Sequence, residues 1–128
     1  MISERDLQEL ARFRPQNGLV LSLYLNVDPR RRTTEKYKLA LRHQLNSVAE
    51  VADQADIARM ERYFDLEYNW QGRGVACFSC QAADFWRAYP LWVPVEDAVF
   101  VSERPYVKPL NDVMGTYCLL YTSPSPRD

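Results

Sequence analysis

The chain contains few of the residues on which disulfide-bonded, metal-dependent and membrane proteins depend. Three cysteines and one histidine occur in 128 residues, which argues against a disulfide framework and leaves too few soft ligands for a zinc site. The longest apolar run, Leu19 to Leu25, contains Ser22 and is too short to cross a bilayer. The first residues, Met1 to Asp6, are charged and lack the apolar core of a secretory signal. We therefore expect a cytoplasmic protein with no metal, no small-molecule cofactor and no membrane partner.

Neither sign of charge is in excess. The 16 lysines and arginines oppose 17 aspartates and glutamates, which gives a net charge of −1 and argues against strong non-specific binding of nucleic acid. The sequence has no glycine-rich phosphate loop and no evident constellation of nucleophile, base and orienting group. What the chain does contain is 47% hydrophobic and 26% charged residues, the balance of one ordinary globular domain.

Apolar periodicity predicts the elements at the start of the chain. Ser3 and Asp6 resemble a capping box that opens a short helix, which ends before Pro15. Residues 19–27 alternate as a strand. Its aliphatic face consists of Leu19, Leu21, Leu23, Leu25 and Val27, and its mixed face consists of Val20, Ser22, Tyr24 and Asn26. The aliphatic face must be covered, and the mixed face is expected to be covered in part.

Two amphipathic helices are expected after this strand. Thr33 or Thr34 can cap the first helix, whose apolar stripe is Tyr37, Leu41, Leu45, Val48 and Ala52. Asp53 or Asp56 can cap the second helix, and Gln71-Gly72 fits its end. The stripe of the second helix is Ile57, Met60, Phe64 and Tyr68, widened by Tyr63 and Leu66.

Short strands are expected in the rest of the chain. They cover residues 74–79, residues 85–91 with a continuation through 93–95, and residues 98–101, and a further helix begins at residues 110–114. Pro90 suits an edge strand or a strand end. This order predicts a single-domain α/β or α+β fold, with a mixed four- to five-stranded sheet packed by the two long helices. If the strands on either side of the helix pair are parallel, the pair forms a right-handed crossover.

Three motifs fit structural roles better than chemical ones. Cys77 and Cys80 form a C-x-x-C inside an apolar strand, where residues three apart point to opposite faces. We interpret them as buried thiols, with redox and metal-binding roles as the alternatives. His43 is expected on a helix surface. Glu61 and Asp65, four residues apart on a helix, are expected to be a solvated pair rather than an acid–base pair.

The densest basic cluster is the best candidate for a binding site. Arg30, Arg31 and Arg32, followed by Lys36, lie at a strand-to-helix connection, where we expect the side chains to project freely. Guanidinium groups match phosphate oxygens, and a helix N-terminus adds positive potential, so the cluster suits RNA. Reversal of the three arginines to glutamate is expected to weaken RNA binding without altering the melting temperature.

Four residues in the second half of the chain are candidates to extend this basic surface. Arg104 and Lys108 would add positive charge, and the exposed faces of Tyr106 or Trp86 would add stacking surface. The RNA-binding candidates are therefore Arg30, Arg31, Arg32, Lys36, Arg104 and Lys108.

Several motifs follow one another in a fixed order along residues 1–117. They are Leu21-Ser-Leu-Tyr-Leu-Asn-Val-Asp-Pro29, the arginine-rich helix start, Gly72-Arg-Gly-Val-Ala-Cys-Phe-Ser79, Phe85-Trp86, the segment from Pro90 to Asp97, and Arg104-Pro-Tyr-Val-Lys-Pro-Leu110. Their order and spacing resemble the N-terminal domain of the bacterial branch of the archaeo-eukaryotic class-1 peptide-release-factor family.

The resemblance implies a role in translation. In that family a central ribonuclease-H-like domain follows, and its Gly- and Gln-containing loop positions water on the peptidyl-tRNA ester. The implied activity of the longer protein is peptidyl-tRNA hydrolysis, in termination or in rescue of stalled ribosomes. The implied partners are the ribosome, through rRNA or tRNA phosphates, and the protein's own central domain.

The chain departs from the family at the functional motifs. It has no Gly-Gly-Gln, and it lacks the Asn-Ile-Lys-Ser element with which eukaryotic factors read stop codons. This departure argues against stop-codon reading and favours a ribosome-rescue role or a role not yet characterised in the family. No catalytic residue is carried over, so the chain alone is expected to have no hydrolase activity.

The end of the chain has a different character from the rest. Cys118-Leu-Leu-Tyr-Thr-Ser-Pro-Ser-Pro-Arg-Asp128 matches one reading frame of a transposase-type sequencing adapter. We therefore expect residues 1–117 to be a truncated N-terminal domain and residues 118–128 to be adapter-derived and without a fold. The alternative is a genuine Ser/Pro-rich tail, which would also be disordered.

Two other function classes stay open. A protein-interaction module without an RNA role fits the near-neutral charge. An unrelated small enzyme has less support, because no catalytic constellation is evident. Steep salt dependence of binding would distinguish phosphate contacts from protein contacts.

Overall fold

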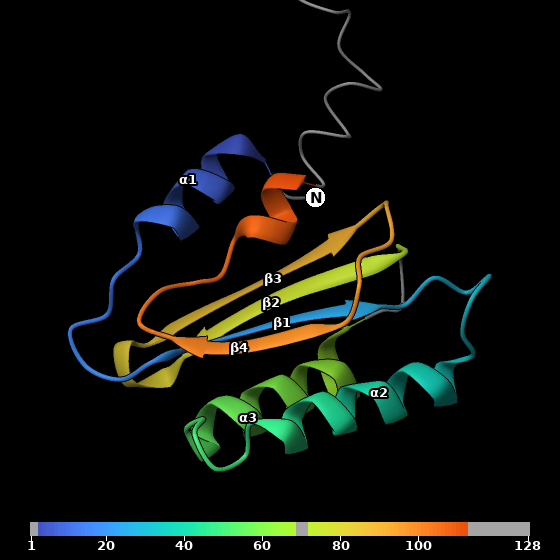
Figure 1. Ribbon diagram of the computed structural model, residues 1–128, viewed down its shortest axis with the longest axis horizontal. Coiled ribbons are helices and arrows are strands. Elements are labelled where there is room, and N and C mark those ends of the chain that lie inside the picture. Colours follow the sequence, from blue (N-terminus) through green and yellow to red (C-terminus); the bar gives the residue numbers. More distant parts are fainter. Residues whose placement is uncertain (1–2, 69–71, 113–128) are drawn as a thin grey trace, which may run out of the picture.

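The computed structural model describes residues 3–68 and 72–112, which form three layers (Figure 1). α1 (Glu4–Arg12) and residues 105–112 cover one face of a sheet, and α2 (Thr34–Ser47) and α3 (Gln54–Arg62) cover the other. Residues 108–112 are helical, so the last expected helix begins two residues early. Its residues 113 and 114, and the expected adapter-derived segment 118–128, lie outside the described residues.

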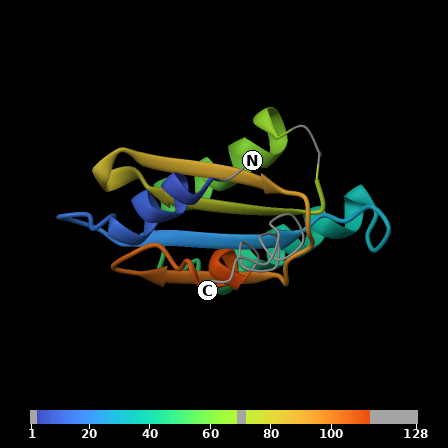
Figure 2. The same ribbon diagram turned by 90° about the horizontal axis from the view of Figure 1, so that it is seen from above.

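The sheet consists of four antiparallel strands, seen from above in Figure 2. Its order is β3 (Phe85–Leu91), β2 (Gly74–Cys80), β1 (Val20–Asn26) and β4 (Ala98–Ser102). The α+β class, the four strands and the two packed helices are confirmed. The mixed sheet and the right-handed crossover are wrong, because β1 and β2 pair antiparallel. α2 and α3 make two successive passes along the sheet, which return the chain to the end where β1 finished (Figure 1).

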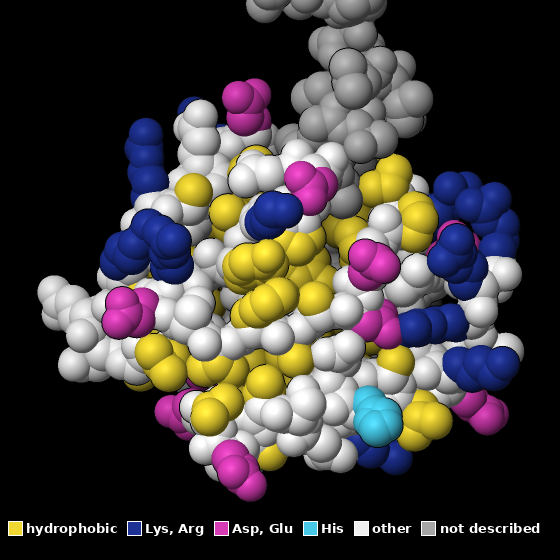
Figure 3. Space-filling model, viewed as in Figure 1, with side chains coloured by type: hydrophobic (Ala, Val, Ile, Leu, Met, Phe, Trp, Pro, Cys, Tyr) yellow, Lys and Arg dark blue, Asp and Glu magenta, His cyan; other side chains and the backbone are white. Residues whose placement is uncertain are grey.

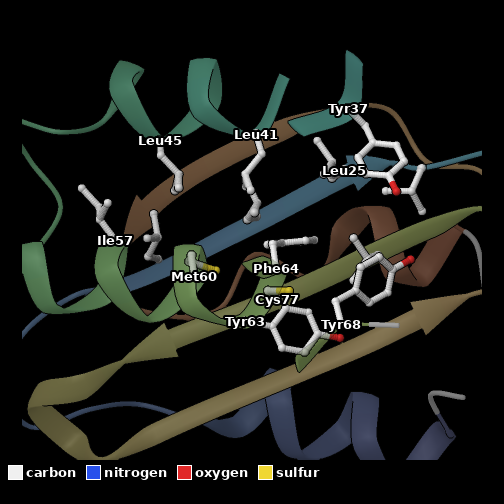
Figure 4. Packing of buried hydrophobic residues seen from close by; sticks show 14 of the residues in the cluster. Leu25, Tyr37, Leu41, Leu45, Ile57, Met60, Tyr63, Phe64, Tyr68 and Cys77 are labelled. Carbon is white, nitrogen blue, oxygen red and sulfur yellow. The ribbon is translucent and has the colours of Figure 1, made fainter. Parts of the chain in front are cut away.

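β1 is buried on both faces along all seven of its residues. On one face Leu21, Leu23 and Leu25 pack against the apolar stripes of α2 and α3, whose side chains point toward the sheet in Figure 4. On the other face Val20 and Tyr24 share a core with Leu10, Phe78 and Leu110. The mixed face is therefore covered completely rather than in part. Leu19 lies outside the strand and is 43% exposed, contrary to its expected place on the aliphatic face.

Polar side chains fasten the segment after β4 onto this second face. The Ser22 hydroxyl accepts the backbone N–H of Tyr106 at 3.0 Å. The Tyr24 hydroxyl donates to the carbonyl of Tyr106. These bonds give two buried hydroxyls partners, so the polar residues of the mixed face help to hold residues 105–107 over the sheet, together with the packing of Tyr106 and Val107 against this core.

The expected caps are present. Ser3 and Asp6 form the capping box of α1, with the Asp6 N–H 3.2 Å from Ser3 Oγ. Thr33 caps α2 and Asp53 caps α3. α2 ends at Ser47, earlier than its apolar stripe suggests, and residues 48–51 form a turn.

A π-helical turn, Tyr63–Glu67, extends α3. The N–H of Tyr68 donates to the Tyr63 carbonyl at 2.7 Å, which closes a loop of five residues instead of four. Tyr63, Phe64 and Tyr68 stay in the core (Figure 4), whereas Leu66 is 78% exposed. The wider turn explains why the expected place of Leu66 on the buried stripe is wrong.

Asp56 joins the first turn of α3 to the end of β2. Its buried Oδ1 accepts the Ser79 hydroxyl and the N–H of Gln81, both at 2.8 Å. Burial raises the pKa of the Asp56 carboxyl, although the two hydrogen bonds oppose the shift. The contact holds the helix in place on the sheet.

β3 and β4 form the two edges of the sheet. Pro90 lies on β3, as expected for an edge strand. Residues 93–95 lie in the loop between β3 and β4 and do not continue β3, contrary to expectation. The loop crosses so close to Gly74 that a Cβ there would lie 3.0 Å from the Val93 carbonyl oxygen.

Candidate nucleic-acid interface

The turn after β1 positions the predicted basic cluster. The Asp28 N–H donates to Asn26 Oδ1 at 2.9 Å, and the Asp28 carbonyl accepts the N–H groups of Arg31 and Arg32 at 2.9 and 3.0 Å. The Asp28 carboxylate accepts the Arg30 N–H at 3.0 Å and contacts Arg30 Nε at 3.5 Å. The backbone hydrogen bond from Arg30, aided by its guanidinium, lowers the pKa of Asp28. An ionised carboxylate therefore organises the turn that carries the arginines.

Arg32 is held by an ion pair. Its Nη2 lies 2.6 Å from Asp97 Oδ2, and its Nη1 lies 3.1 Å from Asp97 Oδ1 and 3.3 Å from the Asn26 carbonyl oxygen. Asp97 also accepts the Asn26 N–H at 2.9 Å. The paired side chains are only 29% and 17% exposed. This bidentate pair joins the β1–α2 connection to the β3–β4 loop. The expectation that all three arginines project freely is wrong for Arg32.

Arg30, Arg31 and Lys36 are exposed around the N-terminus of α2, and we call them the loop cations. The Arg30 side chain is 67% exposed despite its contact with Asp28. Arg31 and Lys36 form no ion pair with any residue in the described ranges. Figure 3 shows Lys and Arg side chains gathered at the end of the molecule where β1 leads into α2. Of the four cations predicted at this connection, the structure therefore brings three together as exposed side chains.

Positive charge extends along α2 beyond the predicted residues. Residues 30–43 contain one acidic residue, Glu35, against six basic residues, namely Arg30, Arg31, Arg32, Lys36, Lys38 and Arg42. The prediction omits Lys38 and Arg42, although their i, i+4 spacing on a helix was a usable signal. These two line a groove of about 100 Å³ together with Glu61 and Asp65 of the α3 segment, whose charges oppose theirs. The uncompensated charge is therefore concentrated at the start of α2.

Arg104 lies at the opposite end of the sheet from the loop cations. β4 pairs antiparallel with β1, so that Ser102 faces Val20 at the beginning of β1. The six residue steps of β1 separate its two ends by about 20 Å. Arg104 and Arg14 line a hollow of about 320 Å³ at that far end. The structure does not bring Arg104 to the arginine-rich loop.

Lys108 lies between the two basic regions. It lines the hollow that contains Arg104, and also a second groove that contains Asp97, the partner of Arg32. Glu96 and Asp112 line that second groove as well. Acidic side chains therefore lie beside Lys108, on the side of it that faces the loop cations.

The two aromatic candidates are engaged by other side chains. The Arg59 guanidinium carbon lies 4.1 Å from the ring centroid of Trp86, and the Tyr63 ring lies 5.4 Å away. Trp86 is on β3, which is separated from β1 by β2. The Tyr106 ring packs against the Phe100 ring at a tilt of 33°, with 3.9 Å between the centroids. Trp86 therefore does not extend the surface around the loop cations, and Tyr106 shares the far-end hollow with Arg104.

The remaining motifs have the expected positions. Cys77 and Cys80 are buried in separate cores on opposite sides of the sheet, and burial raises the pKa of both thiols. The interpretation of Cys77 and Cys80 as buried thiols is confirmed. His43, Glu61 and Asp65 are exposed on their helices, as expected. The described ranges contain no group of three or more His, Cys, Asp or Glu side chains that could hold a metal ion. Within the same ranges, every helix is too short or too polar to span a membrane.

No protein-family model and no curated protein matches this sequence. The likeness to release factors therefore rests on the motifs quoted from the sequence.

Proposed function

We propose that this chain is the N-terminal domain of a bacterial release-factor-like protein that acts on ribosome-bound peptidyl-tRNA in the cytoplasm. In this role the domain contacts rRNA or tRNA phosphates and positions the hydrolase domain of a longer protein, in termination or in ribosome rescue. The observation that carries the proposal is the set of three exposed loop cations at the start of α2, in a chain whose net charge is −1. The motif resemblance supplies the functional class.

The geometry around the loop cations suits a phosphate backbone. The ion pair of Arg32 with Asp97 and the cap at Thr33 fix the backbone from which Arg30 and Arg31 extend. A preorganised site loses less conformational entropy when it binds. The N-terminus of α2 adds partial positive charge beside Lys36, where phosphates bind well.

Cosedimentation with purified bacterial large ribosomal subunits tests the proposal. Arg31→Glu combined with Lys36→Glu is expected to weaken binding at least about tenfold, because it replaces two phosphate contacts with repulsion. The matched control is Arg5→Glu with Arg12→Glu, which reverses two exposed charges on α1. Arg32 stays intact, so the fold keeps its ion pair. Equal binding of wild type, test variant and control would contradict the proposal and favour a protein-interaction module.

A further inference from the structure

The two edges of the sheet differ in how they are protected. β3 carries Arg87 and Pro90, a charge and a residue without an N–H, which are common protections against pairing with another strand. β4 has neither. Its sequence is Ala-Val-Phe-Val-Ser, and each of its five residues is half-exposed. β4 therefore presents a short uncharged edge whose three central residues are strong β-formers, with unpaired backbone groups.

We propose that β4 pairs antiparallel with β4 of a second copy of this chain, about a two-fold axis beside Phe100. The two four-stranded sheets then form one continuous sheet. Such a contact is self-complementary, as two-fold symmetry requires. The inference concerns assembly of the protein and does not depend on RNA binding.

Side-chain charges select this register. When Phe100 faces its own copy, Ala98 faces Ser102 and Val99 faces Val101, so the whole uncharged stretch is paired. Two steps beyond each end of this stretch, in the segments that flank β4, Glu96 of one copy then lies opposite Arg104 of the other. Glu96 and Arg104 are exposed and form no ion pair with any described residue of their own chain. Because of the symmetry, this attraction occurs twice.

The remaining flanking pair does not oppose the register. Asp97 faces Glu103, which would be a repulsion between like charges. The Asp97 carboxylate, however, is already bound by both Nη atoms of Arg32 in its own chain. Its charge is therefore largely compensated before the second copy approaches.

Apolar side chains beside β4 would be covered by the same contact. The Phe100 ring packs against the tilted Tyr106 ring, with 3.9 Å between the centroids, and lines a groove of about 360 Å³ with Pro94, Val95 and Pro109 and with four charged side chains. Figure 3 shows hydrophobic side chains gathered on this face of the molecule. The two-fold axis brings the Phe100 rings of both copies side by side, each with its own Tyr106, and such cross-strand aromatic contacts stabilise sheets.

Charge reversal with rescue tests the inference by sedimentation velocity of the full chain over a range of concentrations. The wild type is expected to show a monomer–dimer equilibrium. Glu96→Arg and Arg104→Glu are each expected to raise the dimer dissociation constant about tenfold, because an attraction that occurs twice becomes a repulsion. The double variant restores the pairing and is expected to return the constant to near the wild-type value.

The control is Arg5→Glu on α1, which changes the charge equally and is expected to leave the dimer unaffected. A wild type that stays monomeric at millimolar concentration would overturn the proposal. So would a dimer whose dissociation constant ignores both single reversals, because it would use another surface. In a second readout, the backbone amides of β4 are expected to exchange with deuterium more slowly as the concentration of the chain rises.

Discussion

Replacement of Arg32 by alanine separates the structural arginine from the loop cations. The substitution removes both charge-assisted hydrogen bonds to Asp97 and leaves that carboxylate, 17% exposed, with the Asn26 N–H as its hydrogen-bond donor among the described residues. A lost hydrogen bond to a buried charged partner costs about 1–3 kcal/mol. The pair is partly exposed, which favours the middle of that range. We expect Arg32→Ala to lower the free energy of unfolding by about 2 kcal/mol.

The comparison with Arg31→Ala makes the measurement specific. Arg31 is exposed and forms no ion pair in the described ranges, so its removal is expected to change the free energy of unfolding by less than about 0.5 kcal/mol. Arg32→Lys keeps the charge but loses the bidentate contact with Asp97, so its stability is expected to lie between those of Arg32→Ala and the wild type. Urea titrations monitored by circular dichroism give these free energies of unfolding. The slope of the free energy against urea concentration is expected to be the same for all variants.

Equal stabilities of Arg32→Ala, Arg31→Ala and the wild type would refute this reasoning. In that case the ion pair with Asp97 would contribute nothing, and Arg32 would join the loop cations. If the difference is found, reversal of Arg30, Arg31 and Arg32 together lowers the melting temperature, contrary to what the sequence suggests. Such a triple variant would then confuse loss of binding with loss of fold.

Three further outcomes follow from buried polar groups. Because burial raises the pKa of Asp56, the native state binds its proton more tightly than the unfolded state, so this group's contribution to stability falls as the pH rises. Asp56→Asn keeps an oxygen acceptor, so in urea titrations it is expected to be more stable than the wild type at about pH 7 and to lose that advantage at about pH 4. A difference in the free energy of unfolding that stays the same at both pH values would contradict this. The pKa of Asp28 is lowered, so its contribution is present above the unfolded-state pKa and is lost as the pH falls through the folded-state pKa. Asp28→Asn is therefore expected to be less stable than the wild type at neutral pH and to approach it in acid. Tyr89 has a buried hydroxyl without a hydrogen-bond partner among the described residues, so Tyr89→Phe is expected to raise the free energy of unfolding by up to about 1 kcal/mol, and a clear loss of stability would show that the hydroxyl is bonded.

Local chemistry made the helix caps and the core predictable from sequence. Thr33 and Asp53 cap helices because their side-chain oxygens can accept the free N–H groups of a first turn. The alternation of leucines on β1 identified the face under α2 and α3. These features depend on residues within a few positions of each other.

Features that join distant parts of the chain could not be predicted in the same way. Apolar periodicity does not specify the direction of a strand, so the antiparallel pairing of β1 with β2 was inaccessible. The partner of Arg32 is 65 positions away, and no local pattern identifies it. The π-helical turn that exposes Leu66 also leaves no periodic signal. For the candidate interface, the sequence therefore located the basic residues but did not indicate which of them are used by the fold.

The salt dependence of binding to the large ribosomal subunit tests the proposed function most directly. If Arg30, Arg31 and Lys36 contact phosphates, the logarithm of the association constant should fall with the logarithm of salt concentration with a slope of about −2 to −3. Removal of one cation, as in Arg31→Gln, should make the slope shallower by about 1 while Arg5→Gln leaves it unchanged. A slope near zero, or one that is unaffected by loss of Arg31, would contradict the proposal that this domain binds RNA phosphates through the start of α2.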